Sequence, residues 1–269
     1  VTADFAADGA SFAFHGYGEE VIRNEPGSNL ILKAMQKIFS LAKTELPELR
    51  LTVKNNIPFG KGMGSSAAAI VAGMWAANYL LGHQFTSSEL LHWAVEMEGH
   101  ADNIVPAVAG GLTTAMLYRE KVLYQKVSLP EGIRVIIVVP DFTLPTEKSR
   151  SVLPEKVNLQ DAVANIQKAC FLLASLQNCD FKNISIAMDD MIYQPWRKKF
   201  IPGFDQVLFE ARKAGAIGVA LSGAGPSIIA LTTENEKNIG KIMGETLKLY
   251  GVSNQVLYLR PVNSGVIYF

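Results

Sequence analysis

The sequence predicts an α+β protein of two lobes, and two observations support this fold class. Strand patterns and helix patterns both occur along the whole chain, whose 269 residues are 49 % hydrophobic and 19 % charged, an ordinary globular composition. The half after residue 130 runs in the order strand, helices, two adjacent strands, helix, strand, which is the order of a ferredoxin-like unit. We therefore expect one lobe over residues 1–130 and a second over residues 131–269.

The first segments are predicted to be strands followed by a capped helix. Apolar residues alternate in short pieces over residues 2–17, broken by Asp8-Gly9, a pattern typical of a hairpin. Ser28-Asn29 supplies side chains that can cap a helix running to about Lys43. Residues 51–53 then form a strand that leads directly into a glycine-bearing loop.

A buried helix and a capped helix follow that loop. Residues 66–81 are apolar on every side, which is typical of a helix enclosed by other elements. Thr86 and Glu89 have the spacing of a capping box, in which the hydroxyl and the carboxylate each satisfy an otherwise unpaired amide. Gly99 is expected to end that helix.

The remaining elements follow from the same periodicities. The apolar run of residues 135–139, stopped by Pro140, predicts a buried strand. The other strands are expected at residues 112–118, 121–127, 217–221, 228–232 and 255–259, and the other helices at residues 158–176, 184–193, 204–214 and 235–250.

Charge and cysteine content argue against several classes of partner. Lys+Arg and Asp+Glu both total 25, and no polybasic run occurs, so we expect neither a nucleic acid nor a membrane partner. The longest apolar stretch, residues 67–81, is interrupted by Asn78 and is shorter than the roughly 20 residues of a spanning helix. The only cysteines, Cys170 and Cys179, form no CxxC motif, which favours a reducing, cytoplasmic setting.

Residues 58–68, Pro-Phe-Gly-Lys-Gly-Met-Gly-Ser-Ser-Ala-Ala, are the most informative stretch. Gly60, Gly62 and Gly64 lack Cβ atoms, so the backbone can adopt positive φ and its amides can approach an anion. The serines then open a helical run, which places unpaired N–H groups and the positive helix end at the loop. The spacing is neither that of a Walker A loop nor that of a Gly-x-Gly-x-x-Gly motif. The residues alone leave open a phosphate site or a glycine-rich turn with a serine cap.

A second glycine-rich stretch, Leu221-Ser-Gly-Ala-Gly-Pro-Ser227, lies between two predicted strands. Gly223 and Gly225 permit a tight turn, and Pro226 fixes φ where the next strand begins. A hairpin turn alone would explain this pattern, so the residues by themselves do not assign it to a ligand.

Together the two stretches resemble the two glycine motifs of the GHMP kinases, with Met63 standing where that family often has Leu. The order and separation of the motifs match, and the resemblance extends over nearly the whole chain. It implies the GHMP kinase fold, with an N-terminal ribosomal-S5-like, nucleotide-binding lobe, a C-terminal ferredoxin-like lobe, and ATP as phosphoryl donor. It implies substrate contacts at Gly223 and Gly225. The nucleotide-binding residues that it implies are Pro58, Phe59, Gly60, Lys61, Gly62, Met63, Gly64, Ser65, Ser66, Ala67 and Ala68.

Three further segments are similar to those of the homoserine kinases within that family. Glu98-Gly-His-Ala-Asp-Asn103 has their His-x-Asp-Asn form, which implies that His100 and Asp102 bind the substrate, Asp102 through an α-ammonium group. Thr146-Glu-Lys-Ser-Arg150 resembles their carboxylate-binding segment, in which Thr146 would share a helix face with Arg150, and Arg197 stands where they have a second substrate arginine. From the residues alone, Asx turns and surface arginines remain open interpretations.

The resemblance also implies a magnesium site. A kinase of this type needs Mg²⁺ at the phosphate oxygens, held by a carboxylate and often a hydroxyl. Glu96 and Glu98 lie two residues apart on a predicted helix, so only one of them can face the phosphates. We predict Glu98 as the metal ligand, with Ser66 or Ser65 as its hydroxyl partner, and keep Glu96 as the alternative. The implied catalytic set is Ser66, Glu98 and Arg150.

The implied activity is transfer of the γ-phosphate of ATP to the side-chain hydroxyl of L-homoserine, a step of threonine biosynthesis. A GHMP kinase acting on a mevalonate-type alcohol, a ligand-sensing relative without catalysis, and a nucleotide-binding but inactive protein remain alternatives. The last arises because the family's N-terminal motif, Pro-x-Ser-x-Ala-Asn-Leu-Gly-Pro-Gly-Phe-Asp, is absent; Val1 has a mid-strand pattern, so we expect the sequence to begin after that motif. The sequence leaves open whether the chain forms a homodimer.

Overall fold

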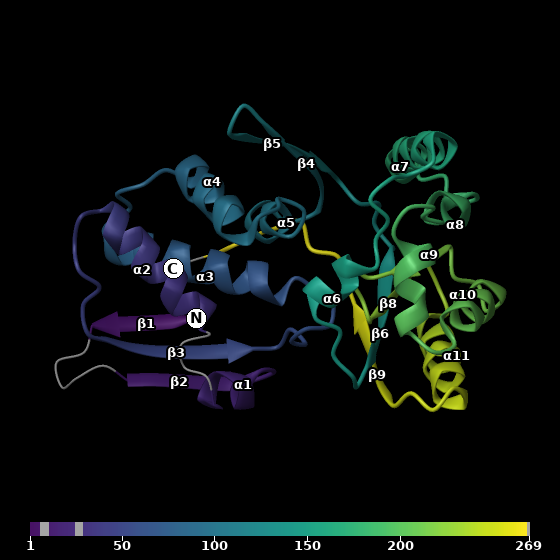
Figure 1. Cartoon of the computed structure of the whole chain (residues 1–269), viewed down its shortest axis with the longest axis horizontal. Coiled ribbons are helices and arrows are strands. Elements are labelled where there is room, and N and C mark those ends of the chain that lie inside the picture. Colours follow the sequence, from purple (N-terminus) through teal and green to yellow (C-terminus); the bar gives the residue numbers. More distant parts are fainter. Residues whose placement is uncertain (6–10, 25–28, 268–269) are drawn as a thin grey trace. The chain divides into compact units, whose positions relative to one another are not determined.

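The computed structural model describes residues 1–5, 11–24 and 29–267, apart from the side chains of Arg23, Thr146 and Glu147. Its two compact units are described separately (Figure 1). The first comprises Val1–Phe59, Gly64–Lys126 and Val262–Phe269, and the second comprises Gly60–Met63 and Val127–Pro261. The main change of unit thus lies near the expected residue 130, while the tip of the glycine loop and the carboxyl-terminal segment fall in the units opposite to those expected.

The first unit combines a mixed three-stranded sheet, a two-stranded sheet and five helices among its described residues. In chain order these are β1 (Thr2–Phe5), β2 (Ser11–Gly16), α1 (Glu19–Asn24), α2 (Leu30–Leu41), β3 (Leu49–Asn55), α3 (Ser65–Leu80), α4 (Ser87–Glu98), α5 (Ile104–Ala109), β4 (Leu112–Tyr118) and β5 (Lys121–Val127). Helices α2 and α3 cover one face of the sheet β1-β3-β2 (Figure 1). Leu49, Leu51 and Val53 of β3 point into this core, and the residues between them are exposed.

The predicted hairpin over residues 2–17 is wrong. Strands β1 and β2 lie on opposite sides of β3, with β1 antiparallel and β2 parallel to it. The expected turn at Asp8-Gly9 lies outside the described residues. Alternation of apolar residues identifies a strand and its buried face, but it does not select the partner strand.

The predicted helix ends in the first unit are confirmed where the structure describes them. The Asn29 side chain caps α2 by accepting from the amides of Ile31 and Leu32 at 3.1 and 3.2 Å, whereas Ser28 lies outside the described residues. Thr86 and Glu89 form the capping box of α4, and Gly99 ends it at a φ of 85°.

The β4–β5 turn and the carboxyl-terminal segment complete the first unit. The two residues between β4 and β5, Arg119 and Glu120, both have positive φ, as in a tight two-residue hairpin turn. The carboxyl-terminal segment is held by Lys126, whose ammonium group donates to the carbonyls of Ala109 and Asn263, and the Gly111 amide donates to the Val262 carbonyl at 2.8 Å.

The second unit has the predicted ferredoxin-like order. Its elements are β6 (Arg134–Pro140), α6 (Thr146–Ser151), α7 (Leu159–Gln177), α8 (Ile184–Ala187), α9 (Gln194–Arg197), the 3-10 helix η2 (Lys198–Phe200), α10 (Phe204–Lys213), β7 (Gly218–Leu221), β8 (Ile228–Thr232), α11 (Glu236–Leu249) and β9 (Asn254–Leu259). The antiparallel sheet has the order β7-β8-β6-β9. The central strand β6 is almost wholly buried, as its apolar run predicts, and α10 and α11 pack on the sheet around one core.

The predicted helix over residues 184–193 is wrong after its first turn. Helix α8 ends at Ala187, and the chain then turns through Asp189 and Asp190 before α9 begins at Gln194. Aspartate side chains compete for nearby backbone amides and favour helix starts over helix interiors, which explains the break.

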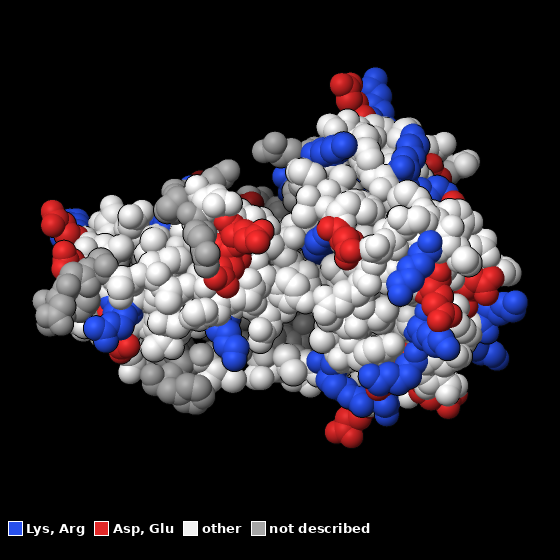
Figure 2. All heavy atoms as spheres, turned by 90° about the horizontal axis from the view of Figure 1, so that it is seen from below, with Lys and Arg blue, Asp and Glu red and all other residues white. Residues whose placement is uncertain are grey.

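The surface carries both signs of charge. On the face shown in Figure 2, basic and acidic side chains intermingle, in keeping with the zero net charge of the sequence. Among the described residues, no helix has the length and apolar character needed to cross a membrane.

Candidate active site

The first group of candidate residues lies at the start of α3 in the first unit. Gly64 occupies the cap position with a φ of 73° and has no side chain to accept from the first amides of the helix. A Cβ at this position would lie 3.1 Å from Oδ1 of Asn103, so a larger residue would press on that side chain. The α3 terminus therefore keeps the unpaired N–H groups that suit an anion.

A hydroxyl and a carboxylate meet beside this terminus. Ser66 Oγ donates to Glu98 Oε2 at 2.7 Å, and the Glu98 side chain is only 11 % exposed. Glu96, the alternative, instead lies 2.8 Å from the ammonium group of Lys37 on α2 and is 60 % exposed. The hydrogen bond from Lys37, and then the charge of that lysine, lower the pKa of Glu96. The structure thus brings Ser66 together with Glu98, and it directs Glu96 elsewhere.

The predicted His-x-Asp element lies next to the same carboxylate. His100 Nδ1 is 2.6 Å from Asp102 Oδ1, and His100 Nε2 is 4.0 Å from Glu98 Oε1. Asp102 is 75 % exposed, which leaves much of its carboxylate open to solvent. The imidazole of His100 therefore stands between two acidic groups.

The tip of the glycine loop belongs to the second unit, where it packs on the second glycine-rich stretch. The positive φ predicted for Gly60, Gly62 and Gly64 is confirmed, with values of 66°, 73° and 73°. Ser222 Oγ donates to the Gly62 carbonyl at 2.9 Å. A Cβ at Gly62 would overlap the Ser222 carbonyl oxygen and lie 2.8 Å from both N and O of Gly225. Only glycine allows this close approach of the two main chains.

Lys61 is held by the main chain that follows β6. Its Nζ atom donates to the carbonyls of Pro140, Asp141 and Phe142 at 2.7, 2.7 and 2.8 Å. Burial lowers the pKa of Lys61, and the charge of Asp141 opposes this shift. Although Lys61 lies in the predicted nucleotide loop, its ammonium group has a structural role in the second unit.

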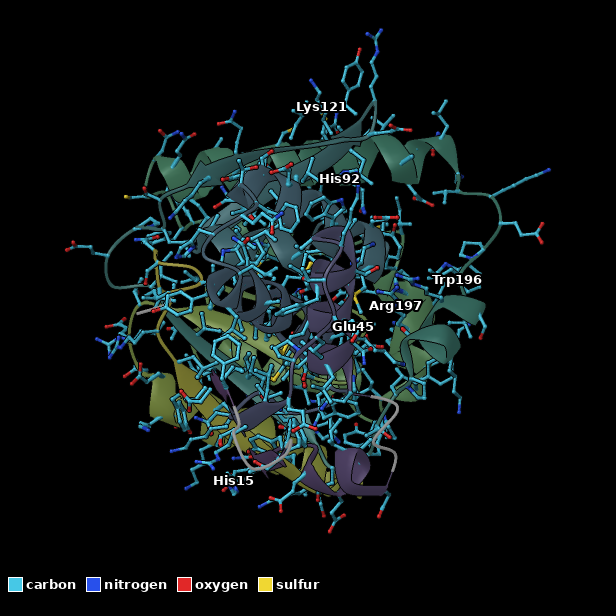
Figure 3. The ribbon with its side chains drawn as sticks, turned by 90° about the vertical axis from the view of Figure 1, so that its left-hand side faces the viewer. His15, Glu45, His92, Lys121, Trp196 and Arg197 are labelled. Carbon is cyan, nitrogen blue, oxygen red and sulfur yellow. The ribbon has the colours of Figure 1, made fainter. Side chains whose placement is uncertain are left out.

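The two predicted substrate arginines also lie in the second unit. Arg150 is exposed on α6, whose first residue is Thr146, and Arg197 ends α9 next to Trp196 (Figure 3). Arg197 donates to the Gly223 carbonyl at 3.1 Å and lies over the Tyr193 ring, 5.0 Å from its centre. Within the described part of the chain, its Nε atom has no hydrogen-bond partner.

Several neighbours affect the pKa of the Arg197 guanidinium group. Burial lowers the pKa of Arg197, and the positive charge of Arg150 adds to this effect, while Tyr193 and Asp190 oppose it. An anion placed beside a partly buried guanidinium group offsets the cost of removing its charge from water. This arrangement suits a carboxylate ligand.

Sequence analysis missed four residues that shape these groups. Ser149, fully buried beside Arg150, donates to the Ala224 carbonyl at 2.8 Å, and the Gln194 side chain accepts from the Leu221 amide at 2.6 Å. Ser222 and Asn103 contact the glycine loop as described above. The only sequence signal was their position next to residues already singled out, because a hydrogen bond to a distant main chain leaves no local pattern.

A metal site is not evident from clustered ligands. Among the described residues, no group of three or more His, Cys, Asp or Glu side chains is arranged to hold an ion. The pair of Ser66 and Glu98 does offer two oxygen ligands, the ligand type that Mg²⁺ prefers when phosphate and water oxygens complete its shell.

An open helix terminus preceded by three glycines in positive φ, with a paired hydroxyl and carboxylate beside it, suits a phosphoryl-transfer enzyme. Family models agree with this class: the GHMP kinases N terminal domain matches residues 29–111, and the GHMP kinases C terminal domain matches residues 172–248. The chain belongs to the GHMP kinase family.

Individual relatives show which members of the family the chain is similar to. The chain is 43 % identical over 252 residues to a homoserine kinase of Carboxydothermus hydrogenoformans, covering 94 % of this chain and 82 % of that protein. It superposes on the crystal structure of a homoserine kinase from Cytophaga hutchinsonii with a TM-score of 0.85 and 29 % identity, covering 98 % and 86 % of the two chains. Mevalonate kinase of L. major shares the fold alone, with a TM-score of 0.71 and 17 % identity over 97 % and 86 %.

Proposed function

We propose that this GHMP kinase transfers the γ-phosphate of ATP to the side-chain hydroxyl of L-homoserine, giving O-phospho-L-homoserine. The relatives that are similar over most of this chain carry the name homoserine kinase. Arg150 and Arg197 suit a carboxylate, which homoserine and mevalonate both have. The observation that carries the choice between them is the exposed carboxylate of Asp102, which suits the α-ammonium group that mevalonate lacks.

In this proposal the arginines bind the α-carboxylate of the substrate. Arg197 is already fixed at one edge by its hydrogen bond to Gly223, and its Nε–H has no partner among the described residues. A planar guanidinium group held in this way can offer further N–H donors to a carboxylate. Arg150, exposed on α6, would supply the second positive charge.

The phosphates of ATP would bind at the start of α3. The amides of Ser65, Ser66 and Ala67 lie in the first turn, after the uncapped Gly64. Main-chain donors at a helix start hold phosphate oxygens without the flexibility of long side chains. The bonds of Lys61 to three carbonyl groups and of Ser222 to Gly62 would keep the preceding loop in place.

Mg²⁺ fits the pair formed by Ser66 and Glu98. A hydroxyl and a carboxylate are the oxygen ligands used with nucleotide phosphates, and the pair is already joined at 2.7 Å. When bound, the ion would neutralise charge that develops on the phosphate oxygens. Glu96 is unsuited to this role because it is bonded to Lys37.

Within the first unit, His100 and Asp102 are the proposed contacts for an α-ammonium group of the substrate. The exposed carboxylate of Asp102 can accept from an α-ammonium group, and the His100 Nδ1 atom lies 2.6 Å from that carboxylate. Phosphoryl transfer through a loose transition state requires chiefly alignment and charge stabilisation, so no strong base is required on the attacking hydroxyl. The proposed role of the protein is therefore to hold two substrates in line.

The proposed setting is the cytoplasm, in threonine biosynthesis. Cys170 and Cys179 are both exposed and unbonded, which is typical of a compartment that keeps thiols reduced.

A coupled assay of ADP release, with the product identified by ³¹P NMR, tests the proposal. We expect turnover with Mg-ATP and L-homoserine, and a kcat/KM at least about a hundredfold lower for L-homoserinol, which lacks the carboxylate but keeps the hydroxyl. L-Serine and mevalonate serve as the comparison alcohols. Faster turnover of mevalonate than of homoserine would reject the proposal, as would ADP release that does not depend on the alcohol.

A further inference from the structure

We propose that Asp190, held by Asn165, is the positioning residue for Arg197 and thereby sets the affinity for the substrate carboxylate. This inference rests on the proposed role of Arg197. It assigns to α7 and to the turn before α9 a function in substrate binding, although neither is part of a motif that the sequence pointed to.

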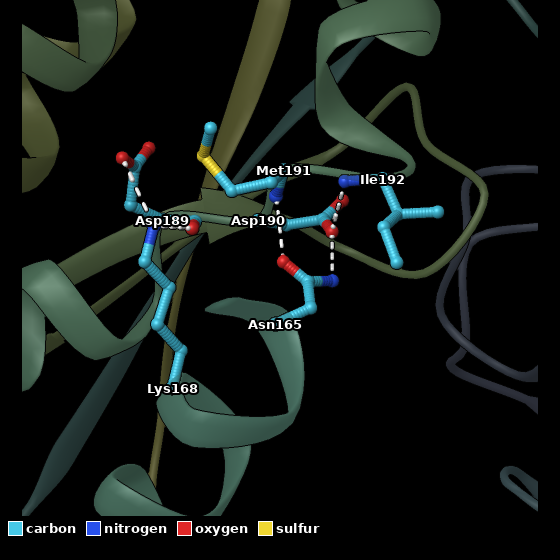
Figure 4. Close-up of polar contacts among 6 residues, drawn as sticks. All are labelled: Asn165, Lys168, Asp189, Asp190, Met191 and Ile192. Atoms are coloured by element: carbon cyan, nitrogen blue, oxygen red, sulfur yellow. Dashed lines mark hydrogen bonds and ion pairs between the residues drawn. The ribbon is translucent and has the colours of Figure 1, made fainter. Parts of the chain in front are cut away.

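The carboxylate of Asp190 organises the turn that precedes α9 (Figure 4). Its Oδ1 atom accepts from the Ile192 amide at 2.9 Å, as Figure 4 shows. Its Oδ2 atom accepts from the amides of Tyr193 and Gln194 at 2.7 and 2.6 Å. One side chain thus satisfies three consecutive main-chain donors. Tyr193, at the cap position of α9, makes no side-chain cap hydrogen bond, so Asp190 caps the helix from outside it.

The turn needs this support because α9 is a single turn. Its four residues, Gln194–Arg197, with proline near the start, form too few internal hydrogen bonds to hold a helix by themselves. An anionic acceptor at the amino-terminal end stabilises such a turn through the helix dipole. Arg197 is the last residue of this turn, so its backbone position depends on the cap.

Asn165 fixes Asp190 from the neighbouring helix α7. Its Nδ2 atom donates to Asp190 Oδ1 at 2.7 Å, and its Oδ1 atom accepts from the Met191 amide at 2.8 Å. One helical turn further on, Lys168 donates to the Asp189 carbonyl at 2.7 Å (Figure 4). Residues 189–191 are therefore fastened to α7 by three hydrogen bonds, two of which involve their main chain.

Both ends of α9 are tied to the second glycine stretch. The buried Gln194 side chain accepts from the Leu221 amide at 2.6 Å, and Arg197 donates to the Gly223 carbonyl at 3.1 Å. Hydrogen bonds thus link α7 to Asp190 and Asp190 to the start of α9, and the single turn of α9 then leads to Arg197 and its bond to the glycine stretch. The negative charge of Asp190 raises the pKa of Arg197, against the lowering that burial causes.

Asp190→Asn tests this inference, and Asp189→Asn is its matched control. Asp190→Asn keeps the size of the side chain but replaces one acceptor oxygen by a donor facing main-chain N–H groups. Asp189 is adjacent and its carboxylate, which is 53 % exposed, makes only a 3.6 Å contact with Lys168. We expect KM for homoserine to rise about tenfold in Asp190→Asn, with kcat and KM for ATP nearly unchanged, and no change in Asp189→Asn.

Double mutants separate positioning from general destabilisation. If Asp190 acts through Arg197, Asp190→Asn combined with Arg197→Ala should have the same KM for homoserine as Arg197→Ala alone. A full additional tenfold rise in the double mutant, or an equal rise in KM for both substrates, would overturn the inference. Asn165→Ala provides a milder variant, with a smaller rise confined to homoserine.

Hydrogen exchange gives a readout that does not depend on activity. The amides of Ile192, Tyr193 and Gln194 should lose protection in Asp190→Asn and keep it in Asp189→Asn. Unchanged protection would refute the cap even if the enzyme prefers another alcohol. Conversely, the wild-type enzyme could fail to phosphorylate homoserine while the three amides lose protection in Asp190→Asn as expected. That result would reject the proposed function, and with it the link between the cap and the affinity for the carboxylate.

Discussion

Replacement of Gly62 by alanine is the sharpest test of how the glycine loop is held. The residue has a φ of 73°, and an added Cβ would overlap the Ser222 carbonyl oxygen while lying 2.8 Å from two main-chain atoms of Gly225. A positive φ costs a non-glycine residue about 1–2 kcal/mol. Contacts with main-chain atoms cannot be relieved by rotating a side chain, and such overpacking costs about 1–3 kcal/mol. We therefore expect a loss of about 2–5 kcal/mol in the free energy of unfolding.

Two other glycines provide matched controls. Gly82 has a nearly equal φ of 71° and no atom within 4 Å of an added Cβ, so Gly82→Ala measures the cost of the backbone conformation alone. Gly60 lies in the same loop as Gly62 with a φ of 66°, and its nearest neighbour would be a methyl group of Thr143 at an ordinary 3.6 Å. Both substitutions should cost about 1–2 kcal/mol.

Denaturant unfolding and ATP kinetics provide the measurements for this series. The excess loss of Gly62→Ala over Gly82→Ala isolates the clash with the second glycine stretch. Separation of the two stretches should also raise KM for ATP by about tenfold or more, equivalent to about 1.4 kcal/mol of lost phosphate binding. Equal losses of stability and of ATP affinity in Gly62→Ala and Gly60→Ala would refute the close approach described here.

Three further substitutions test the other groups. Arg150→Ala should raise KM for homoserine roughly ten- to a hundredfold and leave KM for ATP unchanged, because charge-assisted hydrogen bonds worth about 1.5–3 kcal/mol are lost. An equal effect of Lys148→Ala, on the same helix, would count against a specific role of Arg150. Glu98→Gln should lower kcat and weaken the dependence of rate on Mg²⁺ concentration, whereas a stronger effect of Glu96→Gln would show that the metal ligand is misassigned. Asn29→Ala should lower the free energy of unfolding by about 1 kcal/mol in denaturant titrations because α2 loses its cap, and Asn29→Ser, which keeps an acceptor, should lose much less.

The sequence predicted features that depend on local chemistry. Three glycines in one loop predict positive φ, and the structure has positive φ at each. The capping box of Thr86 and Glu89 and the buried run of β6 are also local, and both are confirmed. Helix geometry predicted that Glu96 and Glu98 point in different directions, and the structure separates the two side chains accordingly. The assignment of the metal to Glu98 stays a prediction.

Features that depend on distant partners could not be predicted. The pairing of β2 with β3 joins segments well separated along the chain, and alternation of apolar residues does not specify it. Asp190 resembles a solvated loop residue because its partners are main-chain amides and an asparagine 25 residues earlier. Lys61 resembles a phosphate ligand by its place in the loop, yet its partners are carbonyl groups beyond β6.

The hydrogen bonds of Lys61 make the position of the glycine loop depend on the segment that follows β6. Three carbonyl oxygens that follow a central strand converge on a single ammonium group, and an arginine could not replace it, since a planar fork does not match three converging acceptors. In the absence of nucleotide, the position of the glycine loop is therefore set by the sheet that contains β6. A slip of one residue between β6 and β8 would therefore move the tip of the glycine loop along with the strand.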